Sequence, residues 1–115
     1  MKRTIELMNR TEQHTCEVHY PLTPKELRSI RPGDHVKAGF LMPAPYKGEK
    51  YERMWIKIRE VDRYKLVGDL ANIPRFFPED QLKAGDEIEV PMEKVLDILH
   101  YDKPHFSVMQ MREHN

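Results

Sequence analysis

The chain of 115 residues is 39% hydrophobic and 33% charged, which predicts one domain with a single core and a heavily charged surface. Nineteen basic and nineteen acidic residues cancel, which disfavours bulk attraction to nucleic acid or anionic membranes but leaves room for a local basic stripe. One cysteine excludes an internal disulfide, and no apolar run approaches the roughly 20 residues that span a bilayer. No signal-peptide core opens the chain, so we expect a soluble, cytoplasmic protein that does not bind membranes.

Residues 1–22 contain two weakly alternating stretches, Thr4–Asn9 and Thr15–Tyr20, joined by the polar stretch Arg10–Gln13. Alternation with period two is typical of strands, so we expect an N-terminal hairpin extension here. A helix over the first dozen residues is the alternative.

A short helix is predicted over Thr23–Ile30 by its start signals. Thr23 is the expected N-cap, Pro24 stands at the first helical position and Glu26 completes a capping box. The sequence Arg-Pro-Gly at residues 31–33 should end the helix. Asp34–Met42 then alternates as a strand, and the proline-containing stretch Pro43–Gly48 is expected to be a loop.

The central hairpin is predicted between Glu49 and Asn72. One face should carry Met54, Ile56 and Ile58 of its first strand beside Leu66, Gly68 and Leu70 of its second. A loop with an odd number of residues keeps these side chains together; three loop residues would pair Ile58 with Leu66, and five are also compatible. A tight two-residue turn is not expected.

The second half of the chain has mixed signals. Two prolines make residues 72–78 irregular, and Pro78–Asp86 reads as a short helical turn that ends at Gly85. Glu87–Val90 should be a strand, preceded by a Gly-Asp turn like the one before Asp34–Met42. Residues 91–100 have helical spacing, and the tail 103–115 could add an edge strand or a frayed helix.

These elements predict a mainly β domain (a β-rich α+β class) spanning residues 1–115. We expect a strongly bent antiparallel sheet or a small SH3-like barrel with one or two short helices. The expected core consists of Val36, Phe40, Met54, Ile56, Ile58, Leu66, Leu70, Ile88, Val90 and Leu96.

Four segments together resemble a known family: Glu52–Ile56 with Met-Trp, Gly68–Pro74, Gly85–Val90 and Val95–Ile98. In type, order and spacing they are similar to domain-of-unknown-function family 2314, a family of small uncharacterised bacterial domains. The likeness covers about Val36 to Ile98, although an aromatic residue that the family often has after its last motif is missing here. The resemblance implies a compact β-rich domain and no particular activity.

No pattern in the sequence predicts catalysis, a metal or a cofactor. His14, Cys16 and His19 cannot all face one ion from a strand, and structural zinc needs four ligands. Cys16 has no feature that would activate it as a nucleophile. The carboxylates of Glu49, Glu52 and Asp69 are expected to be solvated, as are the histidines His100, His105 and His114, which could otherwise titrate together.

The candidate binding site is the face of the central hairpin opposite its core. It carries Tyr51, Arg53, Trp55, Lys57 and Arg59, which alternate cations with aromatic rings. We expect a non-enzymatic protein-binding module that meets an acidic protein surface, such as a toxin-neutralising immunity protein or a phage-encoded inhibitor of a host system. The alternative is a small barrel that binds single-stranded nucleic acid through the same face. A structural alternative packs Trp55 under a helix with its cations reaching solvent.

Overall fold

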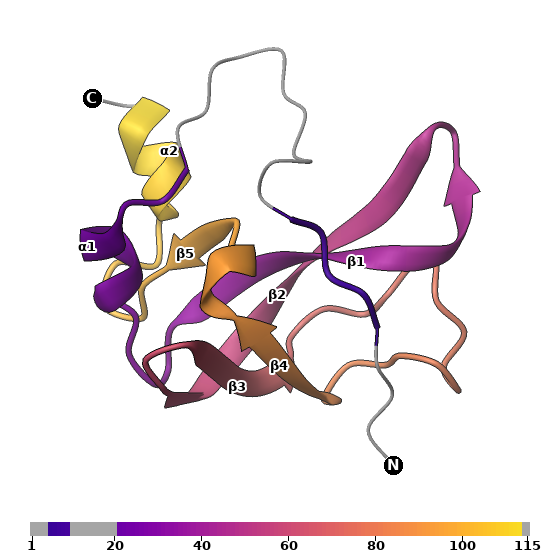
Figure 1. The fold of residues 1–115 in the computed structure, drawn as a ribbon, viewed down its shortest axis with the longest axis horizontal. Coiled ribbons are helices and arrows are strands. Elements are labelled where there is room, and N and C mark those ends of the chain that lie inside the picture. The colour runs from indigo at the N-terminus through magenta and orange to yellow at the C-terminus, as the bar shows by residue number, and fades with distance from the viewer. Residues whose placement is uncertain (1–4, 10–20, 114–115) are drawn as a thin grey trace.

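The computed structural model describes residues 5–9 and 21–113 (Figure 1). Five antiparallel strands form one sheet in the order β4-β3-β2-β1-β5. Their bounds are β1 His35–Tyr46, β2 Glu49–Val61, β3 Lys65–Leu70, β4 Glu87–Pro91 and β5 Asp97–Leu99. Two short helices, α1 (Pro24–Arg28) and α2 (Val108–Glu113), lie beside each other at one end of the sheet. The expected mainly β fold is confirmed as an open, bent sheet rather than a closed SH3-like barrel, because β4 and β5 are separate edges.

Helix α1 begins with the predicted capping box. The Thr23 hydroxyl accepts a hydrogen bond from the backbone N–H of Glu26 at 3.1 Å, and Glu26 Oε1 accepts one from the N–H of Thr23 at 2.8 Å. These two bonds satisfy N–H groups that have no partner inside the helix. The helix ends before Gly33, whose positive φ of 97° is easily adopted only by glycine.

The central hairpin has the predicted faces but not the register of the three-residue loop. Met54, Ile56 and Ile58 are buried together with Leu66, Gly68 and Leu70. Ile58 pairs with Gly68, however, and not with Leu66. A β-bulge between Ile58 and Glu60 absorbs one residue, and the N–H of Asp62 then bonds to the carbonyl of Lys65 across the two residues Arg63 and Tyr64. We had assumed that the loop must hold an odd number of residues. The bulge places the extra residue within β2, so a two-residue turn keeps the apolar side chains on one face.

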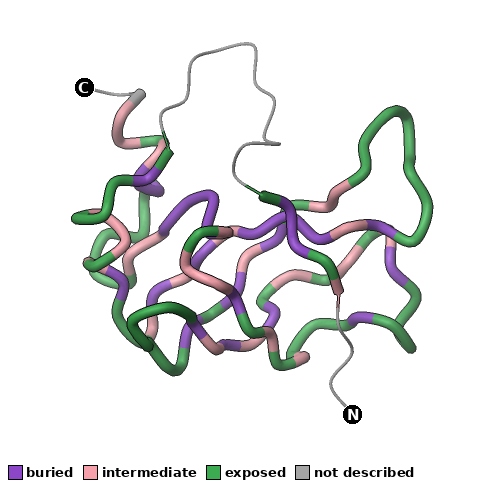
Figure 2. The backbone as a smooth tube through the Cα atoms, in the orientation of Figure 1, coloured by how far each residue is buried: buried purple, intermediate pink, exposed green. Residues whose placement is uncertain are grey.

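The stretch Pro43–Gly48 is not a loop, which corrects our prediction. Strand β1 continues to Tyr46, and only Lys47 and Gly48 separate it from β2. Both turn residues have positive φ, 49° and 83°, as a two-residue hairpin turn requires. A register shift between Leu41 and Tyr46 accommodates the two prolines, which cannot donate to the ladder. The resulting β1–β2 arm extends beyond the sheet and is mostly exposed (Figure 2).

The helix expected over residues 91–100 is absent. A 3-10 turn, η2 (Met92–Lys94), follows β4 and leads into β5, in which Ile98 pairs with Val36. The apolar spacing fits either structure locally, but the free edge of β1 offers hydrogen bonds that a helix could not use. The tail instead forms α2, where Ser107 and Gln110 make a reciprocal capping pair at 2.8 and 3.2 Å.

The core lies on one face of the sheet, which we call the inner face. All ten expected core residues except Ile88 are buried; Ile88 stays half-buried. The core also includes residues outside the expected ten, which come from the N-terminal segment, the residues on either side of α1, the segment around β5, and α2: Leu7, Leu22, Ile30, Val95, Ile98 and Val108. The expected N-terminal hairpin falls mainly on residues 10–20, outside the described residues. Within residues 5–9, Leu7 pairs with Phe40 beside β1.

The two Gly-Asp turns are built alike, as their sequences suggested. At the first, Asp34 Oδ2 accepts from the N–H of Arg31 at 2.9 Å; at the second, Asp86 Oδ2 accepts from the N–H of Lys83 at 3.0 Å. In both turns, the backbone N–H of the Asp also donates to the backbone carbonyl of the residue three positions earlier, Arg31 or Lys83. Each turn starts a strand, and each positions a carboxylate at one of the surfaces described below. In the described part of the chain, no helix has the length and apolarity needed to cross a membrane.

Candidate functional site: a basic face, a polar clasp and an acidic groove

The five predicted site residues lie together on the outer face of β2. Arg53, Lys57 and Arg59 are exposed, whereas Tyr51 and Trp55 are half-buried. Their neighbours in sequence, Met54, Ile56 and Ile58, point into the core, as alternation requires. Trp55 is therefore not fully enclosed.

Pairing with β1 adds two basic residues that the sequence analysis did not include. His35 lies opposite Lys57, and Lys37 lies opposite Trp55. The ammonium of Lys37 stands 4.9 Å from the centroid of the Trp55 ring, which is cation–π geometry. We call the surface formed by Tyr51, Arg53, Trp55, Lys57, Arg59, His35 and Lys37 the basic face. Finding His35 and Lys37 required the β1–β2 register, which spacing within one strand does not reveal.

The cations of the basic face differ in whether a carboxylate neutralises them. Arg59 forms ion pairs with Asp69 at 2.9 Å and Glu87 at 3.2 Å, and Arg53 lies 3.8 Å from Glu49. Among the described residues, Lys37 and Lys57 take part in no ion pair. Burial and then the positive charge of Lys57 lower the pKa of His35, although Asp34 acts in the opposite direction. The uncompensated positive charge is therefore concentrated around Trp55.

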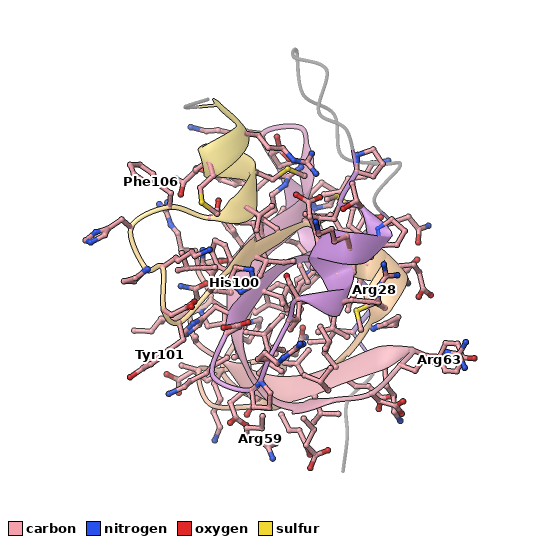
Figure 3. The ribbon with its side chains drawn as sticks, turned by 90° about the vertical axis from the view of Figure 1, so that its left-hand side faces the viewer. Arg28, Arg59, Arg63, His100, Tyr101 and Phe106 are labelled. Carbon is pink, nitrogen blue, oxygen red and sulfur yellow. The ribbon has the colours of Figure 1, made fainter. Side chains whose placement is uncertain are left out.

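A second cluster joins the start of β1 to the end of β5. The buried carboxylate of Asp34 accepts from His100 Nδ1 at 2.9 Å and from the backbone N–H of Tyr101 at 2.9 Å. His100 Nε2 lies 3.2 Å from the hydroxyl oxygen of Ser29. Figure 3 shows His100 against the body of the molecule, while Tyr101 and Phe106 project outward. We call Ser29, Asp34 and His100 the polar clasp; His100 is thus not one of three solvated tail histidines, as we had expected.

The polar clasp contains the atoms of a Ser-His-Asp triad beside a cavity of about 420 Å³. Its hydrogen bonds do not suit nucleophilic catalysis. The Ser29 hydroxyl donates to the carbonyl of Glu26 at 2.5 Å, so its proton is directed away from His100. Ser29 also caps the C-terminal end of α1, where carbonyl groups would repel a developing oxyanion. The arrangement instead suits a structural link in which His100 donates to Asp34.

Asp34 is held in its charged form by this link. Burial alone would raise its pKa, but the N–H groups of Tyr101 and Arg31, together with His100, outweigh that effect and lower the pKa. The sequence could not reveal the cluster, because Ser29 and Asp34 are 71 and 66 residues away from His100.

A groove of about 900 Å³ lies on the inner side of the sheet near β4. We call it the acidic groove. Its walls come from the N-terminal segment, the turn at residues 79–83, and β4 with the residues around it. The residues that line it are Ile5, Glu6, Leu7, Phe40, Glu79, Asp80, Gln81, Leu82, Lys83, Asp86, Glu87, Ile88, Glu89, Pro91 and Lys94.

The other constellations considered from the sequence do not form sites in the described residues. Glu52 accepts from the backbone N–H groups of Arg75 and Phe76, whereas Asp69 pairs with Arg59 on the outer face, so Glu49, Glu52 and Asp69 do not converge. His14, Cys16 and His19 lie outside the described residues. Within residues 5–9 and 21–113, no group of three or more metal-binding side chains is arranged to hold an ion.

The comparison with protein families matches residues 10–112 to the model described as "Uncharacterized protein conserved in bacteria (DUF2314)". The chain belongs to this family. The match confirms the resemblance seen in the sequence and extends beyond it in both directions. Neither the curated proteins nor the solved structures include a match to the chain. The DUF2314 region contains the basic face and the polar clasp, whereas Ile5, Glu6 and Leu7 of the acidic groove precede it.

Proposed function

We propose that this DUF2314 protein is a non-enzymatic protein-binding module whose basic face docks onto an acidic surface of another protein. A toxin-neutralising immunity protein and a phage-encoded inhibitor of a host system are roles of this kind. The observation that supports the proposal is the half-buried Trp55 beside Lys37 and Lys57, two lysines that form no ion pair among the described residues. Aromatic rings next to cations supply much of the binding energy at protein interfaces.

The distribution of ion pairs supports Trp55 as the centre of the proposed interface. Arg59 already has two carboxylate partners, so binding through it would first break ion pairs. Lys37, Arg53 and Lys57 surround Trp55 without such strong partners among the described residues. An acidic partner surface would neutralise them, whereas an apolar partner would leave charges desolvated at several kcal/mol each.

Single-stranded nucleic acid is the competing partner, because cations and rings also suit phosphates and bases. The position of Lys37 favours protein. Its ammonium lies over the Trp55 ring at 4.9 Å, where a base would have to stack, so stacking would displace it. The net charge of zero also supplies no general attraction to a polyanion.

The test is the double variant Arg53→Glu with Lys57→Glu, used with the wild type as bait in proximity crosslinking and mass spectrometry. The matched control is Lys25→Glu with Lys103→Glu, which reverses two exposed lysines elsewhere and changes the net charge equally. We expect one protein to crosslink to wild type and control but not to the double variant. Equal crosslinking by all three would refute the proposal. A fluorescent oligothymidine that binds wild type with a steep salt dependence would instead assign the face to nucleic acid.

A further inference from the structure

We propose that the acidic groove binds an extended basic segment of a partner protein, in which an apolar side chain stands between lysine or arginine residues. This surface is centred on the inner side of the sheet and has the opposite charge, and it meets the basic face only where Glu87 of its lining pairs with Arg59 at 3.2 Å. The proposal uses neither Arg59 nor the function proposed above.

Hydrogen bonds fix the wall of the groove that the N-terminal segment forms. The backbone N–H of Met8 donates to the carbonyl of Gly39 at 2.7 Å, and the backbone N–H of Leu41 donates to the carbonyl of Glu6 at 2.9 Å. Lys94 Nζ then joins the segment to η2 by donating to the carbonyl of Leu7 at 3.2 Å. A groove that is already formed costs a ligand less free energy than one that must be ordered on binding.

The charge of the groove is strongly biased in a chain whose total charge is zero. Six carboxylates line it, those of Glu6, Glu79, Asp80, Asp86, Glu87 and Glu89, against the two ammonium groups of Lys83 and Lys94. Two of the six, Glu87 and Glu89, also pair with Arg59 and Lys65, which lie outside the lining. Within the described part of the chain, Glu6, Glu79 and Asp80 form no ion pair. Cations of a bound segment would complement these three carboxylates, so we expect the ligand to carry positive charge.

The apolar lining gives the second requirement. Ile88 is the one expected core residue that stays half-buried, and it lines the groove beside Leu82 and Pro91. An apolar side chain placed on Ile88 would complete its burial, at about 25 cal/mol per Å² of area removed from water. Exposed wall residues such as Glu79 and Lys83 leave the groove open to solvent. An open groove of about 900 Å³ suits a peptide better than an enclosed small molecule.

The probe is a fluorescein-labelled peptide, Gly-Lys-Arg-Leu-Lys-Arg-Gly, and the readout is fluorescence anisotropy with the full chain. We expect saturable binding that weakens about tenfold, or 1.4 kcal/mol, in the variant Glu79→Lys with Asp80→Lys. The matched control, Glu60→Lys with Asp62→Lys, reverses two exposed carboxylates near the β2–β3 turn and should leave the affinity within about twofold. A probe with glycine in place of leucine should also bind about tenfold more weakly.

Three results would overturn the proposal: no saturable binding by wild type, equal weakening by groove and control variants, or equal affinity for the leucine and glycine probes. If the lysine variant does not fold, Glu79→Gln with Asp80→Asn replaces it, with the same expected direction. The Arg53→Glu, Lys57→Glu variant should bind the probe at least as well as wild type. This variant therefore distinguishes a failure of the groove proposal from a failure of the basic-face proposal.

Discussion

The polar clasp yields a prediction about stability that can be worked out from its geometry. The substitution is Asp34→Asn, which keeps the size of the side chain but replaces one carboxylate oxygen by an N–H₂ group. Asp34 Oδ2 accepts from both the N–H of Arg31 and His100 Nδ1, so two charge-assisted hydrogen bonds are lost. Each is worth about 1.5–3 kcal/mol, and the free energy of unfolding should fall by about 3 kcal/mol or more at neutral pH.

The pH dependence follows from the lowered pKa of Asp34. The unfolded carboxyl takes up its proton near its ordinary value of 3.8, above the folded pKa. The stability that the clasp supplies is therefore fully present above that value and is lost as the pH falls through the folded pKa. Asn titrates nowhere in this range, so the variant should lose stability less steeply than wild type as the pH falls below about 4.

The assay is urea unfolding of wild type and variant between pH 3 and 7, followed by circular dichroism. Asp86→Asn is the matched control, because Asp86 occupies the same kind of Gly-Asp turn, but within the described part of the chain its carboxylate accepts only from the N–H of Lys83. It should cost about 1 kcal/mol or less. Equal losses for the two variants, or unchanged acid sensitivity in Asp34→Asn, would refute the clasp.

Three further predictions concern local structure. Thr23→Ala removes the N-cap of α1 and should lower the free energy of unfolding by about 1 kcal/mol; an unchanged urea midpoint would contradict this. Gly68→Ala would place a Cβ 2.1 Å from the carbonyl oxygen of Lys57, so we expect a loss of about 3 kcal/mol or more in the same assay, and a neutral result would mean that the β2–β3 spacing is wrong. Lys57→Met should raise the pKa of His35 in an NMR titration; because this pKa is lowered in the folded state, neutral His35 supports folding above about pH 6.5, and that contribution is lost as the pH falls. An identical titration curve in the variant would remove Lys57 as a cause.

Local patterns predicted the elements whose structure is decided locally. The capping box at Thr23 and Glu26 specifies hydrogen bonds over three residues, and both form. The alternation along β2 predicted the two faces of the hairpin, because burial of one face is a property of a single strand. The three-residue loop and the exclusion of a tight turn were wrong, since the bulge near Arg59 depends on how β2 meets β3.

Residues 91–100 show where local pattern fails. Their apolar spacing fits a helix, but β5 forms because the edge of β1 provides backbone partners for residues 97–99. This error also concealed the polar clasp, because His100 follows β5 directly and reaches Asp34 only from there. The acidic groove was missed for a similar reason: Glu6 and Glu79 are distant in sequence and line one surface only in the folded chain.

The most direct test of the basic face uses the fluorescence of Trp55, which is the only tryptophan of the chain. Iodide and caesium ions quench an exposed indole by collision, and nearby cations attract the first and repel the second. We predict that iodide quenches Trp55 clearly more than caesium at equal ionic strength, and that Arg53→Glu with Lys57→Glu abolishes or reverses this preference. Equal quenching by both ions in the wild type, or no quenching by either, would contradict an open and positively charged surface around Trp55.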